Sequence, residues 1–208
     1  MQQDKDYTKD ITEIRSMMER STKFLSLAGF AGVIAGVSAI LGAYIACKLY
    51  SFNPDKIVYT QSEVELLEPT LVKIISLAML VLVLAIGSAI FLSSKKATKR
   101  GEKLWDATAK RVVINMAVPL GAGGILILIL INNGLLGLIA PFTLLFYGLA
   151  LFNASKFTYI EVKSLGLIQI ALGFISATFV EYGLLIWAIG FGLVHIIYGI
   201  YMHYKYEK

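Results

Sequence analysis

Cysteine and charge are both scarce in this chain of 208 residues. Cys47 is the single cysteine, which excludes an internal disulfide and a thiolate metal cluster. Only 16% of the residues are charged and 57% are hydrophobic, whereas a soluble domain is about a quarter charged and about half apolar. The sequence also lacks the glycine-rich phosphate loop G-x-x-x-x-G-K-[ST] and any His/Glu/Cys cluster with metal-ligand spacing. We therefore expect no soluble domain, no metal and no bound cofactor.

What the chain has instead is six long apolar runs with almost no charge. Runs of 17 to 24 residues are long enough to cross a hydrocarbon core as helices. Lipid offers no partners to backbone polar groups, so these runs must be helical. The sequence predicts an all-α fold: a polytopic membrane bundle of six transmembrane helices over 24–208, after a short amphipathic helix within 1–23. The predicted membrane helices span 24–47, 71–92, 112–131, 135–152, 164–180 and 184–202.

The nineteen Lys and Arg residues gather in alternate gaps between these runs. With the N-terminus inside, sixteen lie on the inner side and only Lys48, Lys56 and Lys73 lie outside. This is the positive-inside pattern, so we expect a multi-pass membrane protein with both termini cytoplasmic. The net charge of +5 then indicates topology and not nucleic-acid binding. The most basic stretch, 93–111, predicts contacts with anionic lipid through Lys95, Lys96, Lys99, Arg100 and Lys103.

An apolar stripe runs through the charge-balanced segment 4–23. Its members recur at spacings of four, three and four residues: Tyr7, Ile11, Ile14 and Met18. The stripe predicts an amphipathic helix that folds back on the bundle or lies on the bilayer. The alternative is a dimerisation helix or a docking site for a cytoplasmic protein partner. In the first apolar run, small residues four apart (Ala28, Gly32 and Gly36) predict close helix packing, within the chain or in a homo-oligomer.

Few polar side chains interrupt the apolar runs, and polar groups in lipid are candidates for function because they are costly there. The candidate intramembrane polar site consists of His195, Gln169, Asn115, Tyr147 and Tyr198. His195 is the one ionisable group well inside the predicted bilayer. It is either a proton relay or pH sensor, or a neutral packing residue that bonds to a carbonyl, Gln169 or Asn115.

Two further patterns bear on chemistry. Pro119 and the glycines of 121–124 predict a kinked or broken third helix, as found at transport sites. Gly36-Val37-Ser38-Ala39 resembles the G-x-S-G motif of rhomboid proteases, and His195 lies in the last helix as their histidine does. The serine here is in the first helix rather than the fourth, and the final glycine is alanine. A nucleophile needs a positioned base and an oxyanion hole, so we expect no enzyme.

The C-terminal half contains an internal similarity. The segment 134–142 is similar to 183–191, and 146–149 parallels 197–200 after a two-residue shift, which makes Tyr147 and Tyr198 equivalent. The third and fourth helices would then be duplicated as the fifth and sixth.

The run Ala188-Ile-Gly-Phe-Gly-Leu-Val-His-Ile-Ile-Tyr-Gly-Ile200 resembles HdeD-like small bacterial membrane proteins. Glu13-Ile-Arg-Ser-Met-Met-Glu-Arg20 and Leu151-Phe-Asn-Ala-Ser-Lys-Phe157 resemble a group of uncharacterised bacterial six-helix membrane proteins. These resemblances imply a bacterial inner-membrane protein linked to envelope stress or regulation, and they supply no catalytic residues.

Taken together, these patterns predict a non-enzymatic integral inner-membrane protein that is structural, regulatory or stress-related and that self-associates. The alternative is a small channel or transporter with a midplane site near Pro119, Gln169 and His195. A polar route that reaches His195 would favour transport, whereas a tightly packed interior would favour the structural or regulatory role.

Overall fold

The computed structural model describes residues 11, 29–99 and 105–206, and these residues form helices and connecting turns without a strand. Five helices are long and apolar enough to cross a membrane: Gly29–Leu49, Gln61–Lys99, Ala107–Asn132, Leu136–Phe157 and Val180–Tyr206. A sixth helix, α6 (Glu161–Thr178), has 18 residues. The described part of the chain is therefore a helical bundle of the multi-pass membrane type.

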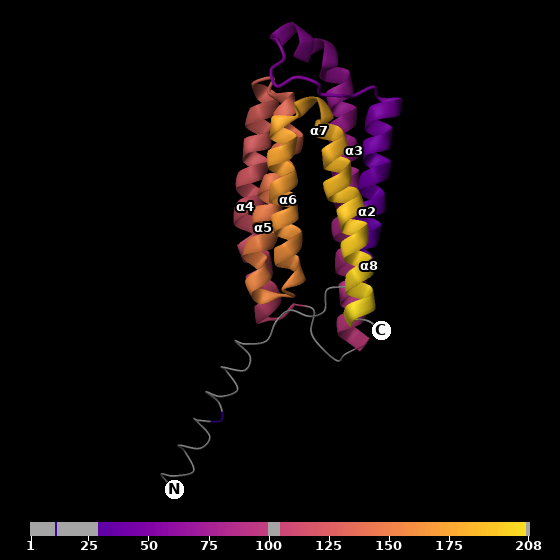
Figure 1. The fold of residues 1–208 in the computed structure, drawn as a ribbon, viewed down its shortest axis with the longest axis vertical. Helices are drawn as coiled ribbons and strands as arrows, with labels where there is room; N and C mark the ends of the chain where they lie inside the picture. Colours follow the sequence, from indigo (N-terminus) through magenta and orange to yellow (C-terminus); the bar gives the residue numbers. More distant parts are fainter. Residues whose placement is uncertain (1–10, 12–28, 100–104, 207–208) are drawn as a thin grey trace.

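The long helices run up and down the bundle in chain order (Figure 1). We call the end at which the last helix finishes the lower end, and the opposite end the upper end. The elements are α2 (Gly29–Tyr44) continued by the π-helix η1 (Ile45–Leu49), α3 (Gln61–Lys99), α4 (Ala107–Asn132), α5 (Ile139–Ala154), α6 (Glu161–Thr178), α7 (Gly183–Trp187), the π-helix η5 (Ala188–Val194) and α8 (His195–Tyr206). Short 3₁₀ turns connect them: η2 (Leu136–Leu138), η3 (Ser155–Phe157) and η4 (Val180–Tyr182).

The bundle consists of two halves. In one half, α5 packs against both α4 and α6. In the other, α2 packs against α3 on one side and against η5 and α8 on the other. The short helix α7 crosses from α6 to η5 at the upper end and contacts α5 and α6 (Figure 1). The interior between the halves is thus bounded by α5 and α6 on one side and by η5 and α8 on the other.

The up-and-down order brings the bases of alternate gaps to the same end. Lys99, Lys110, Lys163 and Lys205 lie near the lower ends of α3, α4, α6 and α8, whereas Lys48 lies near the upper end of α2. The side of the membrane that the lower end faces stays a prediction. Of the predicted lipid contacts, Lys95, Lys96 and Lys99 lie in the last turns of α3, and Arg100 and Lys103 lie outside the described residues. Of the N-terminal stripe, only Ile11 is described, as an exposed helical residue, while Tyr7, Ile14 and Met18 lie outside the described residues.

The helices α3 and α4 begin well before their apolar runs, because polar residues cap them. The helix α3 begins at Gln61 rather than at 71, since the backbone N–H and hydroxyl of Thr60 both donate to Glu63 Oε2, at 2.7 and 2.9 Å. The helix α4 begins at Ala107 rather than at 112, since the Asp106 carboxylate accepts from the Ala109 N–H at 2.6 Å. An apolar run therefore predicts which part of a helix lies in lipid. It does not predict the residue at which the helix begins.

Candidate functional site

Three of the predicted polar residues meet between the two halves of the bundle. His195 opens α8 and is 5% exposed, and Gln169 of α6 is fully buried. The Tyr147 hydroxyl of α5 lies 2.9 Å from His195 Nε2, and His195 Nδ1 lies 2.9 Å from the carbonyl oxygen of Gly190. A neutral imidazole has one donor and one acceptor. Nδ1–H therefore donates to the Gly190 carbonyl, and Nε2 accepts from Tyr147.

Gln169 completes this network from α6. Its amide Nε2 donates to the same Gly190 carbonyl at 2.8 Å and lies 3.4 Å from His195 Nδ1. Its Oε1 is buried and has no hydrogen-bonding partner among the described residues. A Cβ at position 190 would lie 2.6 Å from Leu144 Cδ2 and 2.8 Å from this Oε1, so a larger residue there would require both side chains to shift. Gly190 lies in the π-helix η5, a wide helical turn that is frequent at functional sites.

Aromatic rings surround the histidine. The Phe191 ring lies nearly parallel to the His195 ring, at 5.8 Å between centroids and an angle of 11°. The rings of Tyr147 and Trp187 contact Phe191 at 5.0 and 4.9 Å. Such rings shield their side of the imidazole from water.

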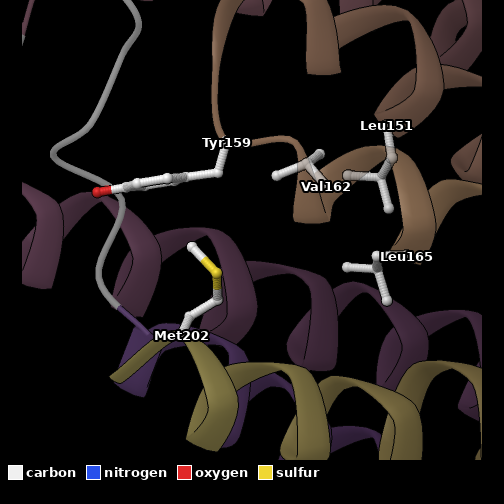
Figure 2. Packing of buried hydrophobic residues seen from close by; sticks show 5 residues of the cluster. All are labelled: Leu151, Tyr159, Val162, Leu165 and Met202. Carbon is white, nitrogen blue, oxygen red and sulfur yellow. The ribbon is translucent and has the colours of Figure 1, made fainter. Parts of the chain in front are cut away.

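An apolar cluster closes the interior below this network. Its members are Leu151, Tyr159, Val162, Leu165 and Met202 (Figure 2). Tyr147 and Tyr198 pack against it, so Tyr198 lies beside the network, whereas the bonds of the His195 ring in the described residues go to Tyr147 and Gly190. The fourth predicted candidate, Asn115, is not brought into the network, since its Nδ2 donates to the Arg111 carbonyl of its own helix at 2.8 Å.

Below the cluster, an ion pair joins α6 to α8. The Glu161 carboxylate accepts hydrogen bonds from Lys205 and from the Tyr206 hydroxyl. Glu161 lies in the first turn of α6, before the apolar run of that helix. Burial acts to raise its pKa, but the hydrogen bonds from Lys205 and Tyr206 outweigh burial and lower the pKa below its ordinary value.

The structure does not bring two predicted elements to this site. Pro119 lies on α4, which packs against α5 rather than against α6 or η5. Its neighbours Gly121 and Gly124 have no atom within 4 Å of a Cβ position, so they face outward. Ser38 is not a partner of His195, whose ring nitrogens face Tyr147, Gly190 and Gln169. The described residues therefore contain no Ser38–His195 pair of the rhomboid type.

Ser176 is a buried polar residue that the sequence reasoning missed. It lies on α6 seven residues after Gln169, is fully buried, and its Oγ lacks a partner among the described residues. The sequence does indicate that Ser176 lies on the same face of α6 as Gln169, because residues seven apart share a face of a helix. A serine is common in membrane helices, so its type alone gave no reason to single it out.

The two halves contain equivalent helix crossings. Gly148 of α5 approaches Gly166 of α6, and Gly199 of α8 approaches Gly29 of α2; in each case a Cβ on the α5 or α8 glycine would lie 2.6–2.7 Å from the other glycine's carbonyl oxygen. Adding 51 to α5 numbers and subtracting 137 from α6 numbers converts one set of contacts into the other. The further matched contacts are Gly166 with Phe152 and Gly29 with His203, Gly173 with Leu145 and Gly36 with Ile196, and Gly148 with Ile170 and Gly199 with Val33.

This equivalence matches α5 with the last helix, as the sequence predicts, and makes Tyr147 and Tyr198 counterparts. It matches α6 with α2 rather than with α4, so the duplication of the third helix as the fifth stays a prediction. The two crossings differ at two matched positions. Leu144 is the counterpart of His195, and Gly32 is the counterpart of Gln169. Each crossing thus contributes one polar residue to the network, at a position where the other crossing has an apolar or small residue.

Comparisons with protein-family models, curated proteins and solved structures found no match to this chain. The resemblances drawn from the sequence therefore stay predictions. Within the described ranges, His, Cys, Asp and Glu residues form no group of three that could hold a metal ion.

Proposed function

We propose that this chain is a small membrane transport protein, a channel or transporter with no enzymatic step, whose site is the network of Gln169, His195 and Tyr147. One observation carries the proposal. The two crossings pack through the same glycine contacts, yet His195 and Gln169 stand where their counterparts are Leu144 and Gly32. Packing alone does not require these polar residues, and polar groups kept inside a membrane at a cost are expected to serve a function.

Two features of the architecture favour transport. Repeats of parallel orientation around a central site are a common plan among transporters. A π-helix beside the site, here η5, leaves a backbone carbonyl free to accept side-chain donors. We place the site at the meeting of Gln169, His195 and Tyr147, and not near Pro119. The proposed location is an inner membrane, with the lower end in the cytoplasm and in contact with anionic lipid.

Purified protein in liposomes tests this proposal. Passage of protons, K⁺, Cl⁻ and urea is measured separately, with a pH-sensitive dye, ion electrodes and light scattering. At least one of the four is expected to pass faster than through protein-free liposomes, and His195→Leu is expected to lower that passage several-fold. The matched control is Ser76→Ala on the outer surface of α3, where the hydroxyl bonds only to the Val72 carbonyl. Equal passage with and without protein for all four probes would contradict the proposal.

The second candidate is a structural or regulatory protein that self-associates. The observation in its favour is that α3 buries only Leu71, Ser93 and Ala97 among its 39 residues. Its long apolar surface suits lipid or a second copy of the chain. Cross-linking in native membranes tests this candidate. A specific dimer formed through α3, together with unchanged cellular function of His195→Leu, would favour it over transport.

A further inference from the structure

Within the described residues, the three buried side-chain atoms without a hydrogen-bonding partner all belong to α6. They are Glu161 Oε2, Gln169 Oε1 and Ser176 Oγ. Native proteins pair most buried polar groups, and an unpaired one in a polar site is commonly satisfied by internal water. Gln169 and Ser176 are both fully buried and lie two turns apart on one face, a rise of about 10 Å at 1.5 Å per residue.

Small residues border this upper part of the α6 face. Gly173, which lies between Gln169 and Ser176 in the sequence of α6, faces Leu145 of α5 and is not part of this border. Across from them, a Cβ at Gly183 would lie 3.7 Å from Ser176 Oγ, and a Cβ at Gly190 would lie 2.8 Å from Gln169 Oε1. Both polar atoms therefore lie beside glycines of α7 and η5, together with the apolar side chains of Ala140, Leu144 and Leu172.

The lower part of the same face is different. Val162 and Leu165 occupy it and belong to the apolar cluster with Leu151, Tyr159 and Met202 (Figure 2). This cluster separates Gln169 from the Glu161–Lys205 ion pair. The α6 face is thus polar and glycine-bordered above the network and apolar below it.

We propose that water enters the seam between α6 and α7–η5 from the upper end and reaches Gln169 and His195, so that protons exchange between this site and the upper side while the apolar cluster closes the lower side. Ser176 Oγ and Gln169 Oε1 hold the water molecules along the seam. The inference rests on the proposed transport function and names its cargo as the proton. The accessible seam itself can be tested without any transport assay.

The proton step at His195 balances with the groups present. A proton from the seam adds to the unprotonated ring nitrogen, whose bond from the Tyr147 hydroxyl is given up, and the ring becomes an imidazolium. Loss of either ring proton to water restores the neutral ring. The groups that face the ring are Tyr147 from α5, Gln169 from α6, and Gly190 and Phe191 from η5. The helix α2 packs against α8 and η5 through glycines and through apolar side chains such as Val33 and Ile40. None of these is a carboxylate, so nothing beside the ring fixes it in the charged form.

Cysteine accessibility tests the seam directly. Wild-type Cys47 is exposed in η1 at the upper end, so its labelling by a membrane-impermeant thiosulfonate identifies which side of a vesicle is the upper side. In a Cys47→Ser background, Ser176→Cys is expected to react from the upper side only. Leu165→Cys, on the same face inside the apolar cluster, is expected to react from neither side. Val83→Cys on the outward surface of α3 serves as the lipid-facing control, since lipid excludes the thiolate that reacts.

Each result has a defined meaning. Ser176→Cys that reacts as slowly as Val83→Cys would overturn the proposal, and so would Leu165→Cys that reacts as fast as Ser176→Cys. Serine and cysteine are nearly isosteric, so the variant is expected to fold, and a thermal unfolding curve checks this. For the cargo, Ser176→Ala is expected to slow proton entry into dye-loaded liposomes at least threefold, with Ser88→Ala on α3 unchanged.

Failure of the inference and failure of the proposed function are distinguishable. Passage of K⁺ or urea that depends on His195, without passage of protons, overturns the proton as cargo and leaves the transport function standing. If none of the four probes passes, the transport function is overturned. The labelling of Ser176→Cys then tests only whether water reaches the seam.

Discussion

The crossing of α5 with α6 and the crossing of α2 with α8 share their backbone contacts but not their side chains. Each places two glycines so close that a Cβ would overlap the opposite carbonyl. Only the α5–α6 crossing has a buried amide, Gln169, and only the α2–α8 crossing has a buried imidazole, His195. The comparison shows that the glycines stabilise the helix contacts. In lipid the hydrophobic effect does not drive helices together, so close packing of their backbones supplies the attraction. The polar residues are then free to serve another purpose.

The largest expected effect comes from filling a crossing. Gly148→Val and Gly199→Val each place a branched side chain against the carbonyl of Gly166 or Gly29. We expect each to lower the free energy of unfolding by about 2–3 kcal/mol, as overpacking of a tight contact does. Gly124→Val is the matched control, because nothing lies within 4 Å of its Cβ position. Thermal unfolding in detergent measures all three, and a control as unstable as the crossing variants would sink the comparison.

The ion pair at the lower end ties one crossing to the other, since Glu161 belongs to α6 and Lys205 to α8. We expect Glu161→Gln to cost about 1 kcal/mol, near the upper limit for an ion pair of this kind. The pKa of Glu161 is lowered in the folded protein, so its contribution is present above the unfolded pKa and is lost as the pH falls through the folded pKa. Unfolding of wild type and variant should therefore converge in acid. A constant difference at every pH would contradict the assignment.

Exchanging the polar residues for their counterparts should affect stability less. In His195→Leu, position 195 carries the residue of its counterpart Leu144, and Gln169→Leu removes the other polar partner. We expect Gln169→Leu to change the free energy of unfolding by less than about 1 kcal/mol, because the Gly190 carbonyl keeps its bond from His195. We expect His195→Leu to cost about 1 kcal/mol, because it leaves the Tyr147 hydroxyl without its partner. Proton passage should fall several-fold in both. A loss of stability as large as in Gly148→Val would show that the network serves packing.

The smallest effect concerns a pair outside both crossings. Glu63 at the upper end bonds to Lys56 and Thr60, and hydrogen bonds from these residues, led by Lys56, lower its pKa to about 2. Its contribution to stability is complete above pH about 4.5 and is lost as the pH falls toward 2. Glu63→Gln should therefore flatten this small slope without changing proton passage. A changed rate of proton passage would contradict its separation from the site.

Much of the fold follows from the sequence because hydropathy and charge placement are local properties. The apolar runs predict the helices, and the repeat predicts that Tyr147 and Tyr198 are equivalent. The sequence also offers a carbonyl or Gln169 as partners of His195; in the structure the partner is the Gly190 carbonyl, and Gln169 donates to the same carbonyl.

Other features depend on three-dimensional contacts that periodicity does not encode. The π-helix η5 is as apolar as an α-helix, so only the two-residue shift between the repeats hinted at extra residues in this segment. Asn115 and Pro119 lie on α4, which packs against α5 and not against α6 or η5, so the structure does not bring them to the network. Ser176 stands out only in the structure, where its hydroxyl is buried without a partner among the described residues.

The central claim is that Gln169 Oε1 and Ser176 Oγ of α6 bind internal water and do not only fill the packed interior. A high-resolution structure of the protein crystallised in a lipid mesophase tests it most directly. The account predicts water density within hydrogen-bond distance of Gln169 Oε1 and Ser176 Oγ, and none within the cluster of Leu151, Tyr159, Val162, Leu165 and Met202. A dry seam, with both atoms bonded to protein groups, would contradict it.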